Sequence, residues 1–128
     1  MFKIDSKNSI DANTKLKKGI YKIYWIRNNG KPKHISRILG TDKEGLLYIG
    51  KTDGTVRNRL NQFRCTAFLK STNHSGALKY RTSNALREAM NNSELFFVAE
   101  YCINPSEKEK ILIKEYRDLY GEVPPLNG

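Results

Sequence analysis

The chain has 128 residues and a mass of 14.7 kDa, which is the size of one compact domain. Hydrophobic residues make up 38% and charged residues 28%, a globular composition that excludes a disordered or collagen-like chain, and no apolar run approaches the roughly 18 residues of a membrane span. We therefore expect no membrane partner. Twenty-three Lys and Arg against 13 Asp and Glu give a net charge of +10, so we expect a polyanionic partner, nucleic acid.

The first half of the chain predicts two strands. Residues 1–16 are polar, and we expect them to form a partly mobile N-terminal lead-in to a single domain over residues 17–128. Gly19 to Arg27 is rich in β-branched and aromatic residues and predicts a strand. Gly45 to Lys51 predicts a second strand, after a long connection that contains glycine and proline. Because no clear helix lies between them, we expect the two strands to pair antiparallel.

The second half predicts three helices and one strand. Apolar residues recur at helical spacing from Val56 to Ala67, with Thr55 placed to cap the helix. A second helix is expected from about Gly76 to Met90, and a third strand from Glu94 to Cys102.

The last helix has the clearest start signal in the chain. Asn104 can cap it, Pro105 fits its first position, and Glu107 follows the cap by three residues, with an end expected near Gly121. The sequence therefore predicts a small α/β domain with a three-stranded, mostly antiparallel sheet flanked by helices, in the order strand, strand, helix, helix, strand, helix.

The cysteines and the charge distribution bear on compartment and partner. Cys65 and Cys102 have no zinc-site spacing with the two histidines, and Met1 to Lys18 lacks the apolar segment of a signal peptide, so we expect buried thiols in a reducing cytoplasm. Residues 1–92 carry 19 basic and 6 acidic side chains, whereas residues 93–128 carry 4 and 7. This asymmetry favours a nucleic-acid surface on the first two thirds of the chain.

Several side chains are candidates for chemistry. Glu109 lies within the inward stripe of the last helix, where it would pair with an arginine, remain solvated near the helix start, or serve a site. On the helix after Thr55, Arg59 is expected to border the sheet, with Arg57 and Arg64 on the opposite flank, and surface solvation is the alternative for each. Two strand tyrosines, Tyr21 and Tyr48, are either core residues or site residues.

These residues carry a resemblance. Gly19-Ile20-Tyr21 followed by Tyr48-Ile49-Gly50 resembles the paired signature of the GIY-YIG nuclease family, known from phage homing endonucleases, some restriction enzymes and the N-terminal domain of the bacterial excision-repair nuclease. The resemblance spans residues 19–127 and includes Lys51, Arg59 in an Asn-Arg-Leu context, Glu109 before Leu112-Ile113, and Asn127 after two prolines. It implies a metal-dependent endonuclease that hydrolyses the phosphodiester bonds of DNA.

The resemblance also implies roles. Glu109 would hold one divalent cation, Mg²⁺ or Mn²⁺, and Arg59 would clamp the phosphate with its planar guanidinium. Tyr48 would act as general base, with its ionised form favoured by neighbouring positive charge. Tyr21 would orient the water or the phosphate. The remaining expected contributors are His74 in proton transfer, Asn127 in positioning the helix or the substrate, and Lys51, Arg57 and Arg64 in substrate binding.

One position departs from the family pattern. Phe63 stands where many members have His or Tyr, and phenylalanine cannot transfer a proton. Its place in the apolar stripe predicts core packing. The alternative function is therefore a catalytically weak or inactive nucleic-acid-binding module of the same fold, and a basic protein that binds structured RNA through charge is a third. The choice of DNA or RNA, the target, the biological role and the oligomeric state stay open.

Overall fold

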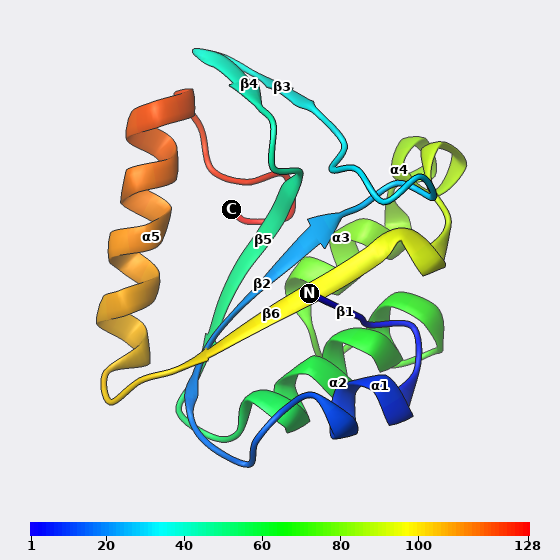
Figure 1. The fold of residues 1–128 in the computed structure, drawn as a ribbon, viewed down its shortest axis with the longest axis vertical. Helices are drawn as coiled ribbons and strands as arrows, with labels where there is room; N and C mark the ends of the chain where they lie inside the picture. The colour runs from blue at the N-terminus through cyan, green and yellow to red at the C-terminus, as the bar shows by residue number, and fades with distance from the viewer.

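The computed structural model describes residues 1–128 and is a mixed α/β fold built on a four-stranded antiparallel sheet with strand order β1-β6-β2-β5 (Figure 1). A separate two-stranded hairpin, β3-β4, lies in the connection between the first two long strands. The elements are β1 (Phe2–Lys3), α1 (Lys7–Ala12), β2 (Gly19–Trp25), β3 (Ile35–Arg37), β4 (Gly40–Asp42), β5 (Leu46–Thr52), α2 (Val56–Phe68), α3 (Ser75–Thr82), α4 (Asn84–Ala89), a short 3-10 turn (Asn92–Glu94), β6 (Leu95–Tyr101) and α5 (Pro105–Tyr120).

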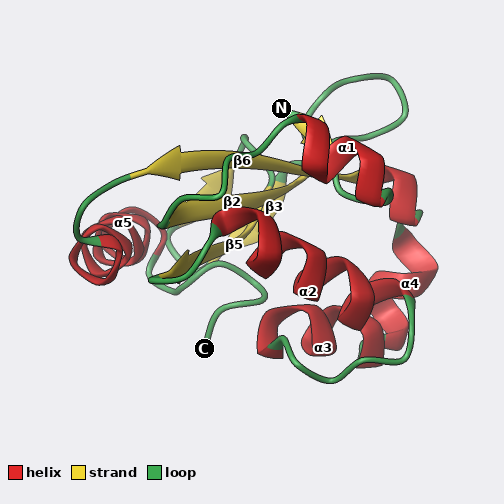
Figure 2. Cartoon of the chain, turned by 90° about the horizontal axis from the view of Figure 1, so that it is seen from below, coloured by secondary structure: helices red, strands yellow, loops and turns green.

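The sheet buries both of its faces. Helices α1, α2 and α3 cover one face, and α5 covers the other (Figure 2). Side chains alternate along β2, so Tyr21 and Ile23 join the core under α2, whereas Tyr24 packs with Tyr116 of α5. The register between β2 and β5 shifts after Ile23, which indicates a β-bulge at this point of the pair. The antiparallel pairing predicted from the sequence is confirmed.

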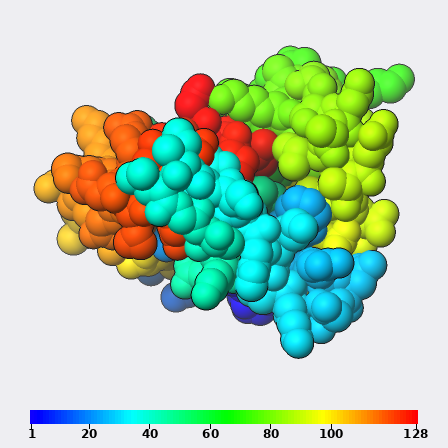
Figure 3. Space-filling view, turned by 90° about the horizontal axis from the view of Figure 1, so that it is seen from above, coloured from blue at the N-terminus to red at the C-terminus, as the bar shows by residue number.

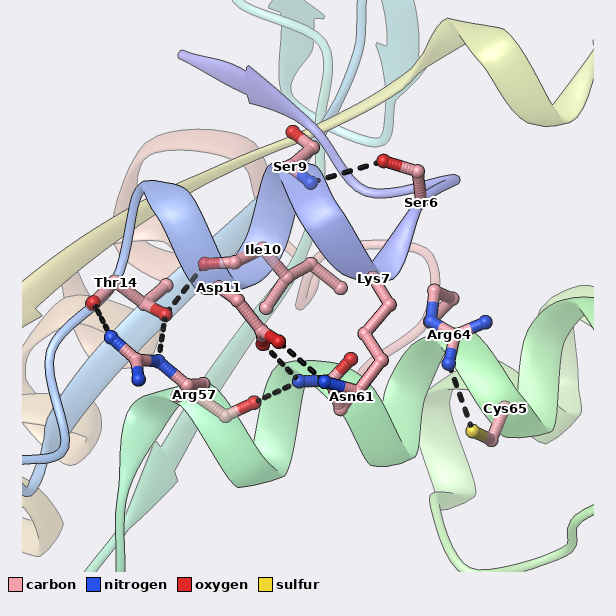
Figure 4. A network of polar contacts seen from close by, with 10 residues as sticks. All are labelled: Ser6, Lys7, Ser9, Ile10, Asp11, Thr14, Arg57, Asn61, Arg64 and Cys65. Atoms are coloured by element: carbon pink, nitrogen blue, oxygen red, sulfur yellow. Dashed lines mark hydrogen bonds and ion pairs between the residues drawn. The ribbon is translucent and has the colours of Figure 1, made fainter.

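Residues 1–16, predicted as a polar lead-in, form a strand and a helix that pack on the rest of the fold. β1 pairs with β6 as a fourth strand, and α1 packs on α2, with Ile4 and Ile10 fully buried. A polar network fixes this contact: Arg57 donates to the hydroxyl and the carbonyl oxygen of Thr14, and Asn61 donates to Asp11 at 3.0 Å (Figure 4). Two isolated isoleucines and a six-residue helix give no periodic signal, which is why the sequence did not predict them.

Two further elements differ from the prediction. The helix expected over residues 76–90 is divided at Ser83, which has an extended backbone and whose hydroxyl accepts from the Leu86 N–H to start α4. The long connection after β2 forms the β3-β4 hairpin, which lies against the C-terminal end of α5 (Figure 3). Arg37 of this hairpin pairs with Glu122 at 2.8 Å.

Helix α5 begins and ends where the sequence predicted. The Asn104 side chain accepts from the Glu107 N–H, Pro105 is the first residue, and Gly121 ends the helix with a left-handed backbone, φ +80°. Cys65 and Cys102 are free thiols, as expected, but both are half-buried rather than buried. None of the helices is both long enough and apolar enough to serve as a transmembrane span.

Candidate functional site

The glycines of the two tripeptides are explained by close packing. Gly19 faces the backbone of β6, and a Cβ there would collide with the Glu100 carbonyl. Gly50 lies directly opposite Tyr21 in the β2-β5 register, and a Cβ there would collide with the ring and the hydroxyl of Tyr21. The small residues therefore allow β2 to sit tightly between its neighbours and the Tyr21 ring to lie across β5.

Four aromatic side chains, from β2, β5, α2 and the N-cap of α3, meet over this part of the sheet. The Tyr21 hydroxyl lies 2.7 Å from Nε2 of His74, and the His74 ring contacts Phe63 edge-to-face with centroids 4.9 Å apart. Tyr48 completes the group, with its ring centroid 5.2 Å from that of His74 and 6.0 Å from that of Tyr21. The structure thus brings together the two strand tyrosines and the loop histidine that the sequence singled out separately.

The protonation state of His74 follows from its partners. The Ala77 N–H donates to Nδ1 at 3.2 Å, which makes His74 the N-cap of α3 and leaves the ring proton on Nε2. Burial and the Arg59 charge lower the pKa of His74 to about 3. At neutral pH His74 is therefore neutral, and its Nε2–H donates to the Tyr21 hydroxyl.

Arg59 is held where it was expected, at the border of the sheet. Its Nη1 donates to Gln62 Oε1 at 2.6 Å and to the Asn73 carbonyl at 3.0 Å. The guanidinium is also close enough to Tyr21 for its charge to oppose the rise in pKa that burial causes in that tyrosine. With Nη1 engaged by two acceptors, the remaining donors of the half-buried guanidinium are oriented by the protein around them.

The tyrosine hydroxyls are not ionised by this environment. Burial raises the pKa of Tyr48, and this effect outweighs the opposing charge of Arg59. Burial likewise raises the pKa of Tyr21, reinforced by the proximity of Tyr48. We expected positive neighbours to favour the ionised form of Tyr48. Arg59 does act to lower the pKa of Tyr48, but burial acts more strongly, and the pKa is raised overall.

Glu109 is distinct among the acidic residues of α5. It is half-buried, whereas Glu107, Glu115 and Asp118 are exposed. Its carboxylate has no hydrogen bond and no ion pair, and burial raises its pKa against the opposing charges of Lys51 and Lys110. It is close enough to Tyr48 for its charge to act on that hydroxyl.

The donor set restricts any metal that this site could hold. No group of three or more His, Cys, Asp or Glu side chains comes together anywhere in the chain. The unpartnered Glu109 carboxylate fits a hard cation such as Mg²⁺, which keeps several waters and takes one or two carboxylates plus phosphate oxygens. It does not fit a structural zinc site, which needs four protein ligands.

The other predicted site residues lie in different surroundings. Asn127 uses its side-chain amide to accept from the Ile49 N–H and donate to the Ile49 carbonyl, both at 2.9 Å, so it fixes the exposed edge of β5 between Tyr48 and Gly50. Asn127 therefore positions a strand of the site, rather than a helix or a substrate.

Lys51 pairs with Asp53 at 3.3 Å.

Arg57 and Arg64 lie outside the cluster. Arg57 points toward the segment after α1 and binds Thr14, whereas Arg64 contacts the sulfur of its neighbour Cys65 on α2 at 3.5 Å (Figure 4). The hydrogen bonds of Arg57 thus stabilise the α1-α2 contact, and the structure offers no support for the expected role of these two arginines in substrate binding.

Sequence reasoning missed two kinds of contributor. Gly76 packs so closely that a Cβ would lie 2.6 Å from the Tyr48 ring, and Gln62 with the Asn73 carbonyl orients Arg59. The Asn-His-Ser-Gly segment at the start of α3 is a sequence signal for this glycine, but only the fold shows what the glycine contacts. No protein-family model, curated protein or solved structure matches the chain.

Proposed function

We propose that this chain is a metal-dependent endonuclease of the GIY-YIG type that hydrolyses phosphodiester bonds of DNA. The observation that carries the proposal is the polar cluster of Tyr21, Tyr48, Arg59 and His74, together with the unpartnered Glu109 whose charge acts on Tyr48. The antiparallel sheet with helices on both faces supports it, since the resemblance implies such a fold.

The cluster suits phosphate chemistry. Cleavage of a phosphodiester builds negative charge on the phosphoryl and leaving oxygens, and preoriented donors stabilise that charge. Arg59 would place its free donors on two phosphate oxygens, because two acceptors already hold its Nη1. The high net positive charge of the chain supports a polyanionic substrate.

The hydrogen bonds of the cluster would donate in one direction, toward Tyr48. The Ala77 N–H is bound to His74 Nδ1, the Nε2 proton is donated to Tyr21, and the Tyr21 proton is then free for the Tyr48 hydroxyl. Tyr48 is therefore the last member of the series. To act as general base it would first release its own proton to solvent, and its phenolate oxygen would then accept a proton from the attacking water. A divalent cation at Glu109 would supply positive charge that opposes the effect of burial on Tyr48.

The direct test is incubation of the pure protein with plasmid, branched DNA and structured RNA, with Mg²⁺ or with chelator. We expect cation-dependent cleavage of DNA, and Tyr48→Phe removes the hydroxyl while keeping the ring that packs against Gly76 and His74. Tyr80→Phe is the matched control, because that hydroxyl donates to Asn92 Oδ1 at 2.6 Å, outside the cluster. Cleavage by Tyr48→Phe at the rate of the control would exclude the general-base role.

A second candidate is a nucleic-acid-binding module of the same fold without turnover. The observation that favours it is the apolar Phe63 in contact with His74, which leaves no titratable group behind the histidine. This candidate predicts salt-sensitive binding of DNA with no cleavage under any metal condition, whereas the nuclease proposal predicts salt-sensitive binding together with cleavage.

A further inference from the structure

A hollow lies beside the candidate site, at the end of the sheet where three strand ends meet. Gly19 at the start of β2 is paired with Thr52 at the end of β5 and with Tyr101 at the end of β6, and α5 begins close by (Figure 1). The hollow has a volume of about 410 Å³ and is lined by Lys17, Lys18, Tyr101, Cys102 and Ile103.

The charges at this end of the sheet differ in whether they are neutralised. Lys51 pairs with Asp53 at 3.3 Å, and Lys108 pairs with Glu100 at 3.1 Å. Lys17 and Lys18 are exposed and form no ion pair or side-chain hydrogen bond. The hollow therefore presents two adjacent positive charges that no acidic side chain of the protein neutralises.

The backbone that carries these lysines is fixed. The Lys17 carbonyl accepts from the Val56 N–H at 2.9 Å, which ties it to the start of α2. The Lys15 N–H donates to the Tyr101 hydroxyl at 2.6 Å, and the Lys15 ammonium lies over the Tyr101 ring. Across the hollow, Ile103 is 88% exposed, so a large apolar side chain stands beside the lysines without a partner in the protein.

We propose that this hollow binds the nucleic-acid backbone next to the phosphate held at Arg59, an inference that rests on the proposed function. Lys17 and Lys18 would contact phosphates, and Ile103 would pack against a sugar or base of the same strand. Lys18 lies directly before β2, three residues or about 10 Å of extended chain from Tyr21, so one nucleic-acid strand can reach both the hollow and the candidate site. These lysines take the substrate-binding role for which Arg57 and Arg64 are poorly placed.

The test measures binding of a duplex DNA oligonucleotide by fluorescence anisotropy in chelator, over a series of salt concentrations. Lys17→Ser/Lys18→Ser removes the two lysines of the hollow, and Lys31→Ser/Lys43→Ser removes two exposed charges near the opposite end of the sheet. We expect the first variant to reduce the slope of log affinity against log salt by about 1.8, because each phosphate contact on duplex DNA contributes roughly 0.9. The second variant should keep the slope of the unmodified protein.

Ile103→Ser should weaken binding several-fold with the slope unchanged, since it removes an apolar contact and no charge. Equal slopes for the two lysine variants, or no binding by the unmodified protein, would overturn the inference. Plasmid cleavage with Mg²⁺ is measured separately. If the unmodified protein cleaves plasmid and the two lysine variants have equal slopes, the hollow does not bind DNA and the proposed nuclease function remains. If only Lys17→Ser/Lys18→Ser lowers the slope and no cleavage occurs, the hollow binds DNA and the proposed nuclease function is wrong.

Discussion

Phe63 connects the stability of the fold to the candidate site, and its truncation has a calculable effect. The side chain is fully buried in the core under α2 and contacts the His74 ring. Phe63→Ala removes these contacts and leaves a cavity, which costs about 3–5 kcal/mol in the free energy of unfolding. With an unfolding entropy of about 2.1 cal/mol/K per residue, the 128 residues give roughly 0.27 kcal/mol/K. We therefore expect a loss of at least about 11 °C in melting temperature.

Differential scanning calorimetry measures this shift, and Phe63→Leu is the matched control that keeps most of the apolar volume and should lose clearly less. Because position 63 packs behind His74, we expect Phe63→His to lower stability and to leave cleavage no faster. A melting temperature for Phe63→Ala within about 2 °C of the parent would refute the packing argument. Faster cleavage by Phe63→His would show that this position takes part in proton transfer.

Three further outcomes follow from the geometry. His74 has a pKa of about 3 in the folded protein and about 6.5 in the unfolded chain, so its contribution to the free energy of unfolding is complete above pH 6.5 and falls by about 1.4 kcal/mol per pH unit toward pH 3. His74→Asn keeps a capping side chain but does not titrate, so urea unfolding at pH 7 and pH 5 should show a smaller loss of stability for this variant than for the parent. Gly50→Ala should cost about 1–3 kcal/mol in the same assay, because the new methyl collides with Tyr21, and an unchanged midpoint would contradict that contact. Arg57→Lys should lose about 1–2 kcal/mol of stability, since lysine cannot make both bonds to Thr14, with DNA affinity unchanged; a loss of affinity alone would restore its predicted role in substrate binding.

Local signals account for the parts of the fold that the sequence predicted. The cap, the proline and the terminal glycine of α5 act within a few residues, and the long strands carry dense β-branched and aromatic residues. The six-residue α1 depends instead on tertiary contacts, because its one buried residue, Ile10, packs in the same core as Val56 and Leu60 of α2.

The candidate site shows the same division. Glu109 was identified by its position on one helix, and the structure leaves it half-buried as expected. The bond between Tyr21 and His74 joins residues 53 apart in the chain, and the close approach of Gly76 to Tyr48 is equally non-local. Such contacts are set by how α3 packs on the sheet, so sequence spacing could suggest the participants but not their partners.

The most direct test of the central claim compares Glu109→Gln with Glu115→Gln in plasmid cleavage across a titration of Mg²⁺. Both changes remove one carboxylate charge from α5, but Glu109 is half-buried near Tyr48 and Glu115 is exposed. The account predicts that Glu109→Gln abolishes cleavage at every Mg²⁺ concentration, while its melting temperature and DNA affinity stay close to those of the parent, and that Glu115→Gln cuts normally. Undiminished cleavage by Glu109→Gln, or cleavage by the parent in excess chelator, would contradict it.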